Sequence, residues 1–210
     1  MEKSNNRKLK FIHITKCAGT FVEDIGEYYG IEWGRLHEEY GYWHEHFINK
    51  PHWLKEKYDW FVIVRNPYER ILSEYYCKHM GIGDTGVVHD KKQFNEYLLN
   101  NIKNREMSKY SYHYAEQYRY IDKNYNIIII KFENLYYQLT ELLNKYYTGI
   151  NVYCFEKVNT KHQSNNVLPF TVNDFSNELI QYINEIYNED FILGRYERIE
   201  INTSTYEFDY

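Results

Sequence analysis

FIHITKCAGT, residues 11–20, is the stretch that decides the fold of this chain. The apolar run over 11–14 is typical of a short strand buried in a parallel sheet. A lysine and three small residues follow it, and apolar positions resume over 21–25 at the spacing of one helix face. The pattern predicts a strand, a tight turn and the start of a helix.

A turn of this kind can bind an anion. The first amides of a helix have no acceptor inside it, and the helix dipole adds positive charge there. Small side chains at Cys17, Ala18 and Gly19 let the backbone close around a phosphate, and Lys16 adds a full charge. A Walker A loop, G-x-x-x-x-G-K-[ST], places its lysine after the glycine, whereas this shorter loop suits a single phosphate group. Taken alone, the stretch is explained equally well by an ordinary structural turn.

Length and composition limit the class of protein. With 210 residues, we predict a single domain over 1–210 with a polar, flexible arm at 1–9. The sequence contains no run of about 18 apolar residues, so it predicts no transmembrane helix. Residues 1–10 lack the apolar core of a signal peptide. The three cysteines are far apart, which fits a reducing compartment, so we expect a cytoplasmic protein. The net charge of −5 argues against a nucleic-acid partner.

The other apolar patterns predict alternating strands and helices. We expect strands at 60–64, 126–132 (buried on both faces) and 152–155. We expect helices from Pro67, capped by Asn66, and over 94–102, 112–122 (more loosely), 133–147 and 172–190, with Gly30 ending the first helix. Residues 31–58 read as mostly loop with short helical turns, and residues 78–90 as a loop. The fold class is therefore α/β with a parallel sheet.

A second candidate anion site begins where the strand at 60–64 ends. Arg65 lies at the carboxyl end of that strand, where open α/β sheets bind ligands. Ser73 follows eight residues later and points back toward the same edge if the helix begins near Pro67. An arginine fork and a hydroxyl can hold a phosphate. The alternative is an arginine paired with Glu69 and a serine facing solvent.

Together the two stretches carry a family resemblance. FIHITKCAGTFVE (11–23) and FVIVRNPYERILSEYY (61–76) resemble the motifs F-I-H-I-P-K-x-A-G-T-S and V-R-N-P-Y-x-R-x-x-S-x-Y of the sulfotransferase superfamily, in its membrane-type carbohydrate branch with bacterial and viral relatives. The resemblance extends to IKFENL (130–135), VNTKHQS (158–164) and IYNEDFILGRY (186–196). It implies a three-layer fold like that of P-loop kinases, with a central parallel sheet flanked by helices.

The resemblance also implies a donor and its site. The family's donor is 3′-phosphoadenosine 5′-phosphosulfate (PAPS), which leaves as adenosine 3′,5′-bisphosphate (PAP), and no metal is expected. By position in the motifs, the 5′-phosphosulfate loop comprises Lys16, Cys17, Ala18, Gly19 and Thr20; Arg65 and Ser73 hold the 3′-phosphate, and Asn159 and Lys161 complete the site. Two positions depart from the motif: Thr15 replaces a proline, and Phe21 replaces a small hydroxyl residue and offers only its backbone.

Sulfuryl transfer needs little besides positioning, charge and a base. We expect Lys16 to neutralise the leaving oxygen and a histidine to accept the proton of the acceptor hydroxyl. Relatives place that histidine between the two motifs, and His44, directly after Trp43, matches best. The alternatives are His37, His46 and His52, and more weakly the carboxylates Glu38, Glu39 and Glu45.

Other interpretations stay open. The four histidines could bind zinc, although their spacing matches no known ligand pattern and no cysteine is near. His13 reads as a core or edge histidine, and Glu133 and Asn134 as capping or loop support. A nucleotide kinase is the second hypothesis, although Lys131 stands where a Walker B aspartate would, and a non-catalytic donor-binding relative is the third. The acceptor, expected to be a glycan or another hydroxyl compound, and the oligomeric state are not readable from the sequence.

Overall fold

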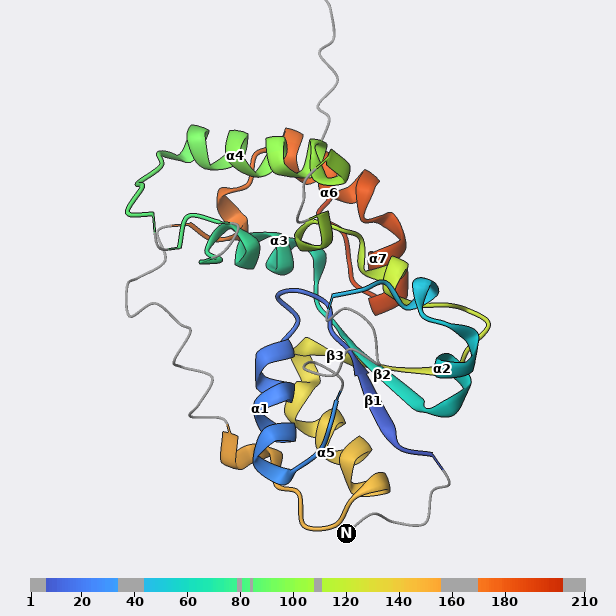
Figure 1. Ribbon diagram of the computed structural model, residues 1–210. Helices are drawn as coiled ribbons and strands as arrows, with labels where there is room; N and C mark the ends of the chain where they lie inside the picture. The colour runs from blue at the N-terminus through green and yellow to red at the C-terminus, as the bar shows by residue number, and fades with distance from the viewer. Residues whose placement is uncertain are drawn as a thin grey trace, which may run out of the picture.

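In the part of the chain that the structure describes, three parallel strands in the order β1-β2-β3 form one sheet. They are β1 (Leu9–Ile12), β2 (Asp59–Val64) and β3 (Ile127–Lys131). The computed structural model describes residues 7–33, 44–78, 81–83, 85–107, 111–155 and 170–201 (Figure 1). In register, Phe11 lies beside Phe61, and Val62 lies beside Ile129. The α/β class and the parallel sheet predicted from the sequence are confirmed.

Two details of the strands differ from prediction. The first strand begins at Leu9, which is buried, and Asp59 donates its amide to the Lys8 carbonyl, so the predicted flexible arm does not reach Leu9. The prediction that the third strand is buried on both faces is wrong, because Ile129 is 37% exposed. In the described part of the sheet β3 has a neighbour on one side only, which leaves part of its surface open.

Seven α-helices are present among the described residues. They are α1 (Gly19–Tyr29), α2 (His52–Lys57), α3 (Pro67–Tyr75), α4 (Lys91–Lys103), α5 (Leu135–Tyr146), α6 (Asn177–Ile186) and α7 (Asn188–Gly194). As predicted, Gly30 ends α1 with a φ of 67°, and the Asn66 side chain caps α3 by accepting the Tyr68 amide at 3.0 Å.

Short 3₁₀ turns replace two of the predicted elements and begin a third. The predicted strand at 152–155 is wrong, since η7 (Val152–Phe155) occupies it, and the loosely predicted helix at 112–122 consists of η4 (Ser111–His113) and η5 (Gln117–Tyr120). The single helix predicted at 172–190 begins with η9 (Val172–Asp174) and then divides at Tyr187 into α6 and α7. The remaining turns are η2 (Phe47–Asn49), η3 (Arg105–Met107) and η6 (Phe132–Asn134).

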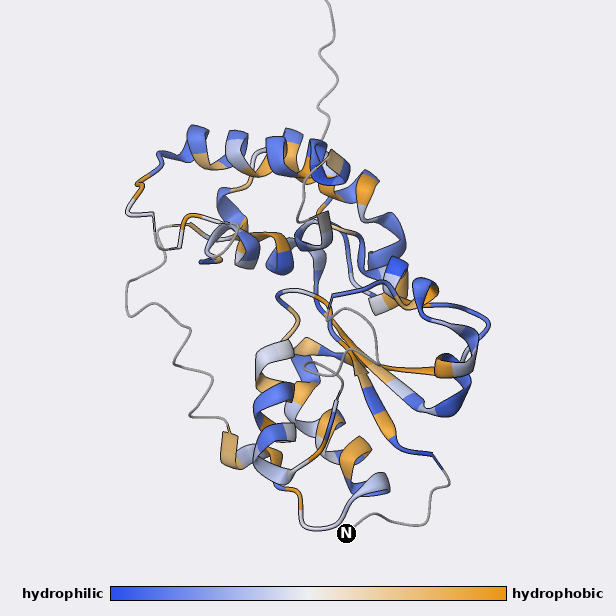
Figure 2. Ribbon diagram, viewed as in Figure 1, coloured by the Kyte–Doolittle hydropathy of each residue, from blue (hydrophilic) through white to orange (hydrophobic). Residues whose placement is uncertain are grey.

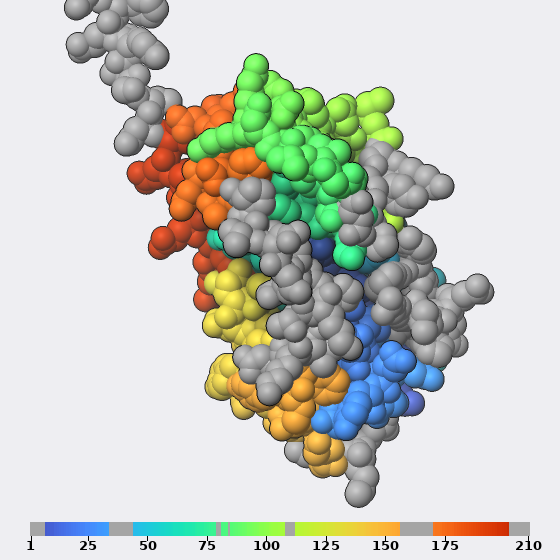
Figure 3. Space-filling view, turned by 90° about the vertical axis from the view of Figure 1, so that its left-hand side faces the viewer, coloured from blue at the N-terminus to red at the C-terminus, as the bar shows by residue number. Residues whose placement is uncertain are grey.

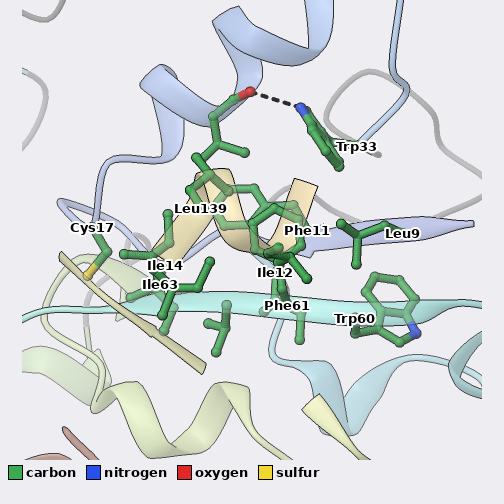
Figure 4. Packing of buried hydrophobic residues seen from close by; sticks show 14 of the residues in the cluster. Leu9, Phe11, Ile12, Ile14, Cys17, Trp33, Trp60, Phe61, Ile63 and Leu139 are labelled. Carbon is green, nitrogen blue, oxygen red and sulfur yellow. Dashed lines mark hydrogen bonds between the residues drawn. The ribbon is translucent and has the colours of Figure 1, made fainter. Parts of the chain in front are cut away.

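Apolar side chains of β1 and β2 pack on both faces of the sheet, because successive side chains of a strand point to opposite faces. Phe61 packs against Phe11 and Trp33 on one side, at ring distances of 4.9 and 5.4 Å. Trp60 packs against Phe47 at 5.2 Å on the other. Figure 4 shows this cluster, with the Trp33 indole donating to the Val22 carbonyl of α1 at 2.8 Å. Helices α1 and α5 lie together beside the sheet, and the strands are mostly apolar (Figures 1 and 2).

A second apolar cluster lies among α3, α4, α6 and α7. Figure 3 shows α4 and the residues from 170 to 201 gathered at one end of the molecule, away from α1 and α5. The loops after β1 and β2 lie where the two clusters meet (Figure 1). Within the described ranges, no helix has the length and apolar character needed to span a membrane.

Candidate active site

The loop after β1 has the geometry of an anion-binding turn. Lys16 and Ala18 both adopt left-handed backbone conformations, with φ of 59° and 60°, and Ala18 is the N-cap of α1. The first backbone hydrogen bond of the helix runs from Val22 to the Ala18 carbonyl. The amides of Gly19 and Thr20 therefore precede the helical ladder and can donate to an anion.

Close packing explains the glycine in this loop. A Cβ added at Gly19 would lie 1.7 Å from Nε2 of His13, a buried side chain at the end of β1. His13 thus packs between the strand and the helix, 4.0 Å from Glu23 of α1, as expected of a core histidine. The contact holds β1 and the start of α1 at the spacing that the loop requires.

Cys17 faces inward rather than toward a ligand. Its side chain is fully buried, and its thiol donates to Gln117 Oε1 at 3.3 Å. Burial raises the pKa of the Cys17 thiol to about 12. Any contribution of Cys17 to the predicted donor site is therefore through its backbone.

Gln117 connects the two candidate anion sites. Its Oε1 accepts the Arg65 amide at 2.8 Å in addition to the Cys17 thiol, and its Nε2 donates to the Arg65 carbonyl at 2.8 Å. Asp190 holds Gln117 in turn by accepting its backbone amide at 2.8 Å. This buried glutamine aligns the end of β2 with the loop after β1.

Arg65 reaches from the end of β2 across to that loop. Its Nη1 donates to the Lys16 carbonyl at 3.3 Å, and its guanidinium lies 4.3 Å from the centre of the Phe132 ring. The alternative partner, Glu69, is present as well, although Nη2 and the carboxylate are 3.7 Å apart and Glu69 is half exposed. In the described part of the chain the buried Nε of Arg65 has no hydrogen-bond partner. A cationic donor is thus left for an anion beside Lys16.

Ser73 lies two turns into α3 and is half-buried. It follows Glu69 by four residues, so both side chains project from one stripe of the helix. Because Glu69 faces Arg65, this stripe faces the same edge of the sheet. The role of Ser73 in the 3′-phosphate site stays a prediction.

Glu133 supports the loop after β2. Its carboxylate accepts the Asn66 amide at 2.9 Å and the Tyr196 hydroxyl at 2.6 Å. Burial, with the Glu133 hydrogen bond next, raises the pKa of Tyr196. Loop support, one of the two readings offered by the sequence, describes Glu133. Asn134 makes no side-chain capping hydrogen bond to α5.

His44 lies next to the end of β1. Its Nδ1 is 3.3 Å from the His13 carbonyl oxygen, and its ring stacks on Tyr112 at 4.8 Å. A carbonyl can only accept, so this hydrogen bond requires a proton on Nδ1. In the neutral ring, Nε2 is then the basic nitrogen.

The other candidate bases lie elsewhere. His46 packs edge-on against Tyr120, and burial followed by the charge of Arg119 lowers its pKa. His52, in α2, lies beside Tyr125 just before β3, at the amino-terminal edge of the sheet and opposite the loops. Glu45 pairs with Lys50 at 3.4 Å. His37, Glu38, Glu39, Trp43, Asn159 and Lys161 lie outside the described residues.

The zinc reading of the histidines has no support among the described residues. His44, His46 and His52 form no group with converging ligand atoms. They contact Tyr112, Tyr120 and Tyr125 respectively, at separate places in the fold.

Sequence reasoning missed two residues that shape the site, and it undervalued a third. Arg70 is fully buried and donates to the Thr15 and Ala115 carbonyls at 3.1 and 2.9 Å. Thr15, noted in the sequence only as a departure from proline, accepts from Arg70 at 3.1 Å and donates to the Tyr112 carbonyl at 3.2 Å. The second arginine of the RNPYER motif was a signal for Arg70, whereas nothing local marks Gln117.

Comparison with known proteins agrees with this geometry. The model of the sulfotransferase family matches residues 4–197, nearly the whole chain and both motifs. A search of curated proteins gives no match, and neither does a search of solved structures. The resemblance read from the motifs is confirmed, and the α/β fold with its parallel sheet is consistent with the P-loop-like fold of the family. The chain therefore belongs to the sulfotransferase family, whose members are PAPS-dependent transferases.

Proposed function

We propose that this protein transfers the sulfuryl group of PAPS to a hydroxyl group of a carbohydrate. The family implies the donor, and the carbohydrate is inferred from the likeness of the two motifs to the carbohydrate branch. One observation carries the proposal most directly. Arg65, at the end of β2, reaches the Lys16 carbonyl in the loop after β1, and among the described residues its buried Nε–H has no hydrogen-bond partner.

The residues present suit a donor with two separate anionic groups. Lys16 and the first amides of α1 would hold the 5′-phosphosulfate, as a short loop with two left-handed residues allows. Arg65 and Ser73 would hold the 3′-phosphate, since a guanidinium provides several donors in a fixed plane. Asn159 and Lys161 are proposed to complete the site from the later loop.

The reaction is an in-line displacement at sulfur. A bond forms between the acceptor oxygen and sulfur as the bond from sulfur to the bridging oxygen breaks, and PAP leaves. Lys16 would neutralise the charge on the leaving oxygen, because preorganised positive charge stabilises such a transition state. His44 would accept the acceptor proton at Nε2, with Nδ1 held by the His13 carbonyl.

Calorimetric titration with PAP in the presence of a chelator tests the donor site. We expect micromolar binding by the wild type and binding about 10- to 100-fold weaker by Arg65→Ala, since hydrogen bonds to charged groups contribute about 1.5–3 kcal/mol. Arg198→Ala is a matched control, because Arg198 is exposed and pairs with Asn188 near the C-terminal end of the described chain. Equal loss in both variants would contradict a specific role for Arg65.

Titration with ATP and magnesium, and a transfer assay with PAPS, separate the competing functions. Binding of ATP with magnesium, and no binding of PAP, would replace the transferase with a kinase. If PAP binds tightly but no sulfuryl group is transferred from PAPS to any of a panel of oligosaccharides, the result supports a non-catalytic protein that binds the donor. Transfer to a hydroxyl compound other than a sugar would keep the reaction and overturn the acceptor.

A further inference from the structure

A buried polar cluster lies at the end of α3, on residues to which the proposed reaction gives no role. It consists of Glu74, Cys77 and His113, which are 0%, 5% and 7% exposed. One ligand-type atom from each residue lies within 4.8 Å of the others. His113 Nδ1 and Glu74 Oε2 are 2.8 Å apart.

One carboxylate oxygen of this cluster has unused hydrogen-bonding capacity. Glu74 Oε1 is buried and has no partner within the described ranges. A buried carboxylate oxygen without a partner costs free energy, and a cation bound to it would remove that cost.

The donor types identify the cation that fits. A thiolate, an imidazole and a carboxylate form a mixed sulfur, nitrogen and oxygen set, which suits zinc and is too soft for magnesium or calcium. We propose that Glu74, Cys77 and His113 bind a zinc ion. A water molecule would fill the fourth position.

The fold brings the three ligands together for a reason independent of metal. Glu74 lies in the last turn of α3, and Cys77 follows just beyond the helix, where its amide donates to the Glu74 carbonyl at 3.0 Å. His113 comes from η4, and its carbonyl accepts hydrogen bonds from Arg70 at 2.9 Å and from Thr15 at 3.3 Å. The ion would therefore tie α3 to the segment that supports Thr15, immediately before the Lys16 loop.

Metal content and cobalt spectroscopy test this site without any measurement of activity. The chain is purified in the Cys154→Ser background, which removes the exposed thiol, stripped with chelator and titrated with Co²⁺ or Zn²⁺. We expect one equivalent of tightly held metal and a thiolate-to-cobalt charge-transfer band. Cys77→Ser should abolish the band, and His113→Asn should weaken binding at least tenfold.

Matched variants and a stability readout complete the test. His52→Asn, an exposed histidine in α2, should leave the band and the stoichiometry unchanged. Zinc should raise the melting temperature of the stripped protein and leave that of Cys77→Ser unchanged, since an ion that binds only the folded state stabilises it. The proposal is overturned if the stripped parent protein shows no charge-transfer band and no thermal shift, or if Cys77→Ser retains both. If Cys77→Ser does not fold, the parent spectrum and the His113→Asn affinity decide.

Discussion

The imidazole of His13 lies against the backbone of Gly19, where an added Cβ would come within 1.7 Å of Nε2. We expect Gly19→Ala to lower the free energy of unfolding by about 3 kcal/mol, because a methyl group forced into a packed site displaces its neighbours. PAP binding should weaken as well, since the displaced ring lies beside the Lys16 loop. Urea unfolding and calorimetry measure the two effects.

Gly30→Ala is the control for that variant. Gly19 begins α1 and Gly30 ends it, with a φ of 67°. A Cβ added at Gly30 would meet nothing within 4 Å. The loss should be about 1–2 kcal/mol from the left-handed conformation alone, with PAP affinity unchanged. A loss as small in Gly19→Ala as in Gly30→Ala would contradict the steric explanation.

Gln117→Leu should weaken PAP binding although Gln117 is not a predicted ligand. The change leaves the amide and the carbonyl of Arg65 without partners, which costs about 1–3 kcal/mol for each buried group. Arg65 then loses its alignment with Lys16, and we expect an affinity loss of about tenfold. Gln138→Leu is a matched control, because Gln138 also accepts a backbone amide, that of Lys131, but on β3. Equal PAP affinity in the two variants would contradict the proposal that Gln117 positions Arg65.

Features that depend on residues close in sequence could be predicted, whereas contacts between residues far apart in sequence could not. The turn at 16–19 and the cap at Asn66 depend on neighbouring residues, and both were predicted correctly. Gln117 contacts Cys17, which lies 100 residues away in the sequence, and no local sequence pattern predicts such a contact. The apolar run at 152–155 was predicted as a strand, but these residues form a 3₁₀ turn whose Val152 and Phe155 pack into the core beside α5.

Asp190 should make stability depend on pH. Burial raises the pKa of its carboxyl from 3.8 to about 6, although the amides of Gln117 and Tyr118 oppose the shift. Because the folded state holds this proton more tightly, the contribution of Asp190 is present below the unfolded pKa and is lost as the pH rises through about 6. Relative to Asp190→Asn, the wild type should lose about 3 kcal/mol between about pH 4 and pH 7. Urea unfolding of both proteins measures this difference, and a gap that stays constant with pH would contradict it.

The three cysteines should react at very different rates with a thiol reagent. Cys154 is exposed, whereas Cys17 and Cys77 are buried. Burial raises the pKa of Cys17 from 9.0 to about 12, which lowers its thiolate fraction on the order of a thousandfold. In the native protein we expect one fast thiol, lost in Cys154→Ser, and three in denaturant. A fast native phase that survives Cys154→Ser would show that a buried thiol is accessible.

His44→Ala tests the proposed base after the donor site has been established. Its Nδ1 lies 3.3 Å from the His13 carbonyl, so loss of the ring removes the basic Nε2 and leaves Lys16 and Arg65 in place. We expect kcat to fall by about 10²–10⁴, the usual contribution of general base catalysis, with PAP affinity within about threefold of wild type. His52→Ala should change neither quantity, because His52 lies at the opposite edge of the sheet. If His44→Ala instead weakens PAP binding and leaves kcat unchanged, His44 belongs to the donor site, and the base must be sought among the remaining candidates, His37 first.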